Sequence, residues 1–107
     1  MAQGPPIIDL VQAARAKRVL FLPHAIRAMA RPTPILTRSD VEAVIFQGEV
    51  IEDYPEDARG HSCLLLGSPQ GRPVHVVCSP KEDYLAVITA YLPDEAQWLA
   101  GFRERKR

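Results

Sequence analysis

Four polar side chains in two apolar runs are the residues best suited to chemistry in this chain. Arg72 and His75 lie in or beside one run, and Thr89 and Tyr91 lie in the next. A polar group buried in an apolar strand needs a hydrogen-bond partner or a ligand. A neutral imidazole at His75 can accept a proton near pH 7, and Arg72 can hold a phosphate or a carboxylate through two parallel hydrogen bonds. These residue types therefore indicate a site for an anionic substrate.

Each of these side chains also has a structural interpretation. His75 could be a core histidine that is hydrogen-bonded to a backbone carbonyl or to Glu52. Tyr91 could be an amphipathic sheet residue whose hydroxyl is held by a neighbour. The sequence alone leaves both alternatives open.

A second polar group lies in a short helix predicted over residues 24–31. His24 begins this helix, and Arg27 and Arg31 follow at helical spacing, before the prolines that end it. His24 could cap the helix or act as a base. We expect His24, Arg27, Arg72, His75 and Tyr91 to form the catalytic site, if the protein has one.

Metal and cofactor motifs are missing from the sequence. The three histidines are far apart and have no ligand spacing. There is no phosphate-binding glycine loop, no GxSxG motif and no HExxH motif. We therefore predict neither a metal nor a cofactor.

The composition is that of one small domain spanning residues 1–107, of which 47% are apolar. No apolar run reaches membrane-spanning length and the first residues do not resemble a signal peptide, so we expect no membrane contact. Cys63 and Cys78 are predicted to be buried thiols of a cytoplasmic protein, with a disulfide as the alternative. The net charge is zero, but residues 1–48 and 103–107 are basic and could supply a face for nucleic acid.

The predicted fold is α+β. We expect a helix from about residue 6 to residue 18, an edge strand at 19–22, the short helix at 24–31, and a helix that begins at a near capping box formed by Thr37 and Asp40. Four strands at 49–54, 62–66, 74–78 and 84–92 have short connections, which indicates an antiparallel meander. A last helix beginning at Asp94 should pack Trp98 on the sheet.

The same motifs resemble those of a bacterial family of domains of unknown function, over roughly residues 20–98. The matching stretches are residues 24–25, 48–55, 62–67, 71–77 and 88–93. This family is similar to the RelE/ParE-like toxins, including the BrnT group. Residues 1–18 would be an additional helix before this region.

The resemblance implies a RelE/ParE-like fold, metal-independent RNA cleavage, and a zinc-finger type antitoxin-like partner. The chain departs from the family pattern at Ala28, where the family helix carries arginine; Arg27 and Arg31 lie near this position. A one-residue shift turns a helical side chain by about 100°, so the sequence leaves open whether Arg27 or Arg31 replaces the family arginine. The alternative function is a non-catalytic protein-interaction module of the same fold.

Overall fold

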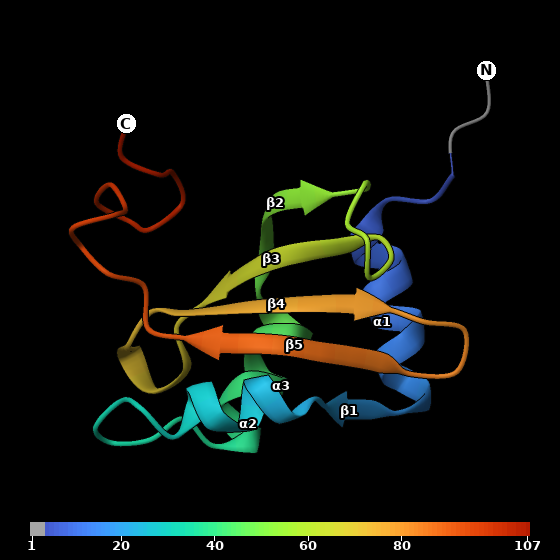
Figure 1. Cartoon of the computed structure of the whole chain (residues 1–107), viewed down its shortest axis with the longest axis horizontal. Helices are drawn as coiled ribbons and strands as arrows, with labels where there is room; N and C mark the ends of the chain where they lie inside the picture. The colour runs from blue at the N-terminus through green and yellow to red at the C-terminus, as the bar shows by residue number, and fades with distance from the viewer. Residues whose placement is uncertain (1–3) are drawn as a thin grey trace.

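A computed structural model describes residues 4–107 and shows an α+β fold (Figure 1). The elements are α1 (Ile7–Lys17), β1 (Val19–Phe21), α2 (Pro23–Met29), α3 (Arg38–Gln47), β2 (Glu49–Tyr54), β3 (Ser62–Gly67), the 3-10 turn η1 (Pro69–Gly71), β4 (Val74–Pro80) and β5 (Leu85–Tyr91). No helix in this part of the chain is long and apolar enough to cross a membrane.

The sheet has five strands in the order β1-β5-β4-β3-β2. Strands β2 to β5 pair antiparallel in succession, whereas β1 pairs parallel with β5. The predicted antiparallel succession of four strands is present in β2 to β5, but the sheet as a whole is mixed, because β1 pairs parallel with β5 as a fifth strand. Parallel partners need a long connection, and here the whole of the chain from α2 to β4 lies between β1 and β5.

Helices α1 and α3 cover one face of the sheet and form the core with it (Figure 1). Val11 of α1 and Val41 and Ile45 of α3 are fully buried in one cluster with Leu65 and Val76 of the central strands. The capping box that begins α3 is present: the Thr37 hydroxyl accepts from the Asp40 amide, and the Asp40 carboxylate accepts from the Thr37 amide. The core thus lies on one side of the sheet and leaves the other face for different contacts.

Helix α2 follows β1 along the edge of the sheet. β1 pairs with only the first three residues of β5, and α2 then packs beside the remainder of that strand (Figure 1). Ala25, Ala28 and Met29 are the buried residues of α2. The small side chains of Ala25 and Ala28 allow a close approach to β5, which brings the polar residues of α2 next to Thr89 and Tyr91.

The predicted C-terminal helix is wrong. The Asp94 carbonyl accepts from the Trp98 amide and closes one turn, but the Leu99 amide then donates to the Glu104 carbonyl, which folds the chain back on itself. The left-handed backbone of Gly101 (φ +89°) makes this reversal. We call residues 93–107 the C-terminal strap. Trp98 still packs on the protein and is only 3% exposed, as expected.

Candidate functional site

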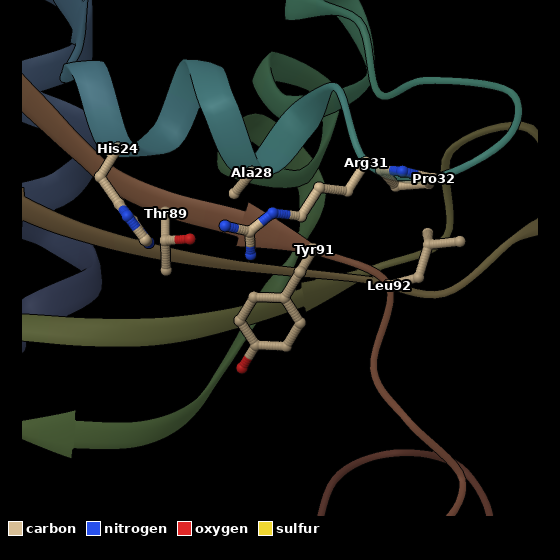
Figure 2. Close-up of a pocket in the computed structure, with 7 residues that line it drawn as sticks. All are labelled: His24, Ala28, Arg31, Pro32, Thr89, Tyr91 and Leu92. Carbon is tan, nitrogen blue, oxygen red and sulfur yellow. The ribbon is translucent and has the colours of Figure 1, made fainter.

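An open pocket of about 550 Å³ lies between α2 and the end of β5 (Figure 2). Its lining residues are His24, Ala28, Arg31, Pro32, Thr89, Tyr91 and Leu92. This set contains an imidazole, a guanidinium and two hydroxyl groups, and it includes no carboxylate. Such a lining suits a ligand with negative charge.

Local geometry explains why these residues meet. His24 and Ala28 are four residues apart and lie on one side of α2, and Arg31 follows two residues after the helix ends. Thr89 and Tyr91 are two residues apart on β5 and share a face of the sheet. Figure 2 shows His24 beside Thr89, and the Arg31 side chain extending under Ala28 toward Tyr91. The methyl group of Ala28 leaves room for this guanidinium.

Tyr91 is joined to His75 on the neighbouring strand. The two residues are direct partners in the β4–β5 register, so they share a face, as expected. The Tyr91 hydroxyl lies 3.3 Å from His75 Nδ1, and the two rings meet edge to face at 5.4 Å. Burial raises the pKa of Tyr91, so its hydroxyl keeps its proton at neutral pH.

The hydrogen bonds of His75 define its tautomer. Its Nε2 atom lies 2.9 Å from the Phe102 carbonyl oxygen, which can only accept, so Nε2 carries the proton. In the neutral ring, Nδ1 then accepts from the Tyr91 hydroxyl. Burial lowers the pKa of His75, an effect that the Phe102 carbonyl opposes. The neutral form is therefore the native one.

His75 does not line the pocket. It is fully buried, with the Trp98 ring edge to face at 4.4 Å on one side and Tyr91 on the other. This is the arrangement of a core histidine bonded to a backbone carbonyl, which was the alternative interpretation. Its one connection to the pocket is the hydrogen bond to the Tyr91 hydroxyl.

Arg72 lies at a different place from the pocket. Its terminal nitrogens donate to the carbonyl oxygens of Pro34 (2.7 Å) and Ile35 (2.9 Å), and one of them lies 3.9 Å from the Asp40 carboxylate. It therefore fixes the loop between α2 and α3. Arg27 is exposed and is not among the lining residues. Of the five residues expected at the site, the structure brings only His24 and Tyr91 into the pocket, where Arg31 joins them.

A second polar network lies under the C-terminal strap. Arg105 donates to both carboxylate oxygens of Glu52, at 2.9 and 3.0 Å, and Tyr54 also donates to Glu52. The hydrogen bonds from Arg105 lower the pKa of Glu52, and burial raises that of Tyr54 to about 12. Sequence reasoning missed this network and the contact of the Phe102 carbonyl, because a backbone acceptor and a contact spanning 53 residues leave no local pattern.

No cluster of metal-ligating side chains occurs within residues 4–107. Cys63 and Cys78 are free, buried thiols, and they are cross-strand neighbours on β3 and β4. The pocket's own residues are of types that can transfer protons and bind anions: an imidazole, a guanidinium and two hydroxyl groups.

The fold and the pocket define a small α+β protein with a cationic, open site at the edge of its sheet. The chain belongs to the family described as a domain of unknown function, DUF4258, whose model matches residues 21–92. The expected membership of such a family is confirmed. No curated protein and no solved structure matches the chain. The matched region contains every residue of the pocket and ends just before the C-terminal strap.

Proposed function

We propose that this protein is a metal-independent endoribonuclease whose site is the pocket between α2 and β5. The observation that carries the proposal is the convergence of His24, Arg31 and Tyr91 on one open pocket without a carboxylate. RNA cleavage through the 2′-hydroxyl needs a base, a cation on the phosphate and an acid for the leaving oxygen. The pocket holds one residue suited to each task.

In the proposed reaction, His24 removes the proton of the ribose 2′-hydroxyl. The 2′-oxygen attacks the adjacent phosphorus, the bond from phosphorus to the 5′-oxygen breaks, and a 2′,3′-cyclic phosphate forms. Arg31 binds the non-bridging oxygens as negative charge grows on them. The Tyr91 hydroxyl turns its proton from His75 Nδ1 to the departing 5′-oxygen and donates it there. Burial raises the pKa of Tyr91, so the hydroxyl carries this proton at neutral pH. His24 ends protonated and Tyr91 deprotonated, and solvent restores both.

The resemblance to RelE/ParE-like toxins supports RNA as the substrate and an antitoxin-like, zinc-finger type protein as the partner. It also supports a cytoplasmic location, where the RNA would be found. These assignments belong to the proposal and are tested with it.

The experiment measures cleavage of a labelled RNA by purified protein in the presence of EDTA. We expect the wild type to yield fragments ending in a 2′,3′-cyclic phosphate. His24→Ala and Tyr91→Phe should each reduce the rate by about 10²–10⁴-fold, the usual effect of losing a general base or acid. An RNA with a single 2′-deoxy position should resist cleavage there.

The matched control is a pair of arginines on the same segment. Arg31→Ala should reduce cleavage, whereas Arg27→Ala, which removes the same charge from an exposed position outside the pocket, should not. Equal losses in the two variants would mean that overall charge matters and the pocket does not. An inactive wild type, or an undiminished rate in His24→Ala, would overturn the proposal.

A second candidate function is a non-catalytic interaction module, which an apolar groove favours. The groove has a volume of about 480 Å³ and is lined by residues that include Phe21, Ile26 and Ile35. Ile26 and Ile35 are 58% and 55% exposed and line the same groove, and exposed apolar side chains that are grouped mark interaction sites. If this function is correct, Ile26→Asp abolishes a complex with the antitoxin-like protein, and the wild type cleaves no RNA.

A further inference from the structure

The C-terminal strap lies outside the region shared with the family, yet it contacts the residue behind the pocket. The Phe102 carbonyl accepts from His75 Nε2 at 2.9 Å, and the Trp98 ring packs on the His75 ring at 4.4 Å. Both partners belong to residues 93–107, whereas the family match ends at residue 92. The strap therefore lies beyond the residues that the family model matches and contacts His75, which is hydrogen-bonded to Tyr91.

This contact determines the direction of the Tyr91 hydroxyl proton. Since the carbonyl of Phe102 requires a proton on Nε2, Nδ1 of the neutral His75 ring is a bare acceptor. The Tyr91 hydroxyl must then donate to it in the resting protein, which fixes the position of the phenol oxygen beside the pocket. Without the carbonyl, His75 could carry its proton on Nδ1 instead, and Tyr91 would become the acceptor.

The strap is held mainly by contacts at the surface. Arg103 pairs with Glu49 and Arg105 with Glu52, and the two arginine side chains are 60% and 57% exposed. The Arg105 guanidinium also lies 4.6 Å from the centre of the Trp98 ring. A cavity of about 370 Å³ separates the tip of the strap from the ends of β3 and β4. Exposed ion pairs are screened by salt. Apart from Pro93 at its start, Trp98 is the buried residue of the strap.

We infer that the C-terminal strap positions Tyr91 through His75, with Trp98, Arg105 and the Phe102 carbonyl as the positioning groups. When the strap is docked, the Tyr91 hydroxyl points to His75. When the strap leaves, that hydrogen bond loses its fixed direction. The effect on RNA cleavage rests on the proposed function, but the link from strap to Tyr91 does not.

The test uses two reporters in the intact protein. Trp98 is the single tryptophan of the chain, so its fluorescence reports docking of the strap directly. Nitrogen-15 NMR of His75 reports which ring nitrogen carries the proton. We expect His75 of the wild type at low salt to be protonated on Nε2. On addition of NaCl, the Trp98 emission should shift to the red and this tautomer should disappear, and both changes should be half complete at the same NaCl concentration.

Arg105→Ala should shift that midpoint to lower NaCl. Arg38→Ala is the matched control, because Arg38 also forms an exposed ion pair, with Glu42, and also lies over an aromatic ring, Phe21, but is remote from the strap. It should leave the midpoint unchanged. Native methyl resonances of the buried residues Val41 and Ile45 would verify that the core stays folded. The NaCl titration of the wild type tests the inference even if Arg105→Ala does not fold.

Either of two results would overturn the inference. One is exposure of Trp98 while His75 keeps its proton on Nε2; the other is a Trp98 that stays buried in Arg105→Ala at every salt concentration. In a cleavage assay, Arg105→Ala should lower the rate constant by up to about 10²-fold, the scale of a misplaced catalytic group, with little change in KM. If the wild type cleaves nothing, the proposed function fails, and the two reporters still decide the coupling.

Discussion

The sharpest prediction concerns His75, because its structural and catalytic roles have opposite consequences. His75→Ala should destabilise the fold, since the imidazole is fully buried and both of its nitrogens are hydrogen-bonded. A residue that served chemistry alone would be removed with little effect on stability. His24→Ala should behave in that second way, because His24 is exposed on α2.

The size of the effect follows from the contacts. Loss of a net hydrogen bond costs about 1 kcal/mol. The Phe102 carbonyl and the Tyr91 hydroxyl each lose one, and any water that enters the space left by the imidazole reduces this cost. Each of the two edge-to-face ring contacts adds about 0.5–1.5 kcal/mol. The expected total is about 3 kcal/mol, equivalent to a fall in Tm of about 12 °C in a domain of this size.

The pH dependence has a definite sign. Because burial lowers the folded-state pKa of His75 below its ordinary value of 6.5, the unfolded chain binds the proton more readily. Wild-type stability should therefore decrease as the pH falls below about 6.5, an effect that persists down to the folded-state pKa. The variant lacks this linkage. The difference in stability between wild type and His75→Ala should thus be largest above pH 6.5 and smaller below it.

Urea denaturation of wild type, His75→Ala and His24→Ala at several pH values measures these quantities. His24→Ala should stay within about 0.5 kcal/mol of the wild type, as is usual for an exposed residue. A His75→Ala variant as stable as the wild type, or a stability difference that grows as the pH falls, would refute the assignment of His75 as a buried neutral histidine.

Three further results are expected. Arg72→Ala should lower the free energy of unfolding by about 1–3 kcal/mol, because two hydrogen bonds from the guanidinium to the α2–α3 loop are lost; urea denaturation would show it, and an unchanged midpoint would contradict it. Thr37→Ala should lower the free energy of unfolding by about 1 kcal/mol, because the N-cap of α3 is lost. The Thr37 amide lowers the pKa of Asp40, so the stability that this carboxylate contributes should be present near neutrality and disappear in acid. Asp40→Asn should not show this loss in acid. Cys63 and Cys78 should react with a thiol reagent only in denaturant; rapid labelling of the native protein would disagree with their burial.

Local patterns in the sequence were sufficient to predict elements that depend on neighbouring residues alone, such as a helix start or a strand connection. The capping box at Thr37 and Asp40 predicted the start of α3, and the short connections predicted the antiparallel order of β2 to β5. The parallel pairing of β1 with β5 could not be predicted in this way, because it joins residues more than sixty positions apart and depends on where the core places both strands.

The C-terminal strap shows a different limit. Asp94 does begin a turn, and Trp98 does bury its ring, so the signals for a helix were real. The chain nevertheless reverses at Gly101, because Arg103 and Arg105 form ion pairs with carboxylates on β2 and the carbonyl of Phe102 accepts a hydrogen bond from His75. These tertiary contacts outweigh the weak helix preference of a short segment.

A polar residue in an apolar strand can be part of the core and still contact a site, as His75 does. His75 drew attention because burial of an imidazole demands partners, and the structure supplies them from within the chain. Those partners, however, connect the strap to Tyr91 and so to the pocket. A side chain can thus be a core residue by its burial and still hold, through one hydrogen bond, a residue that lines a pocket: His75 contacts Tyr91 without lining the pocket itself.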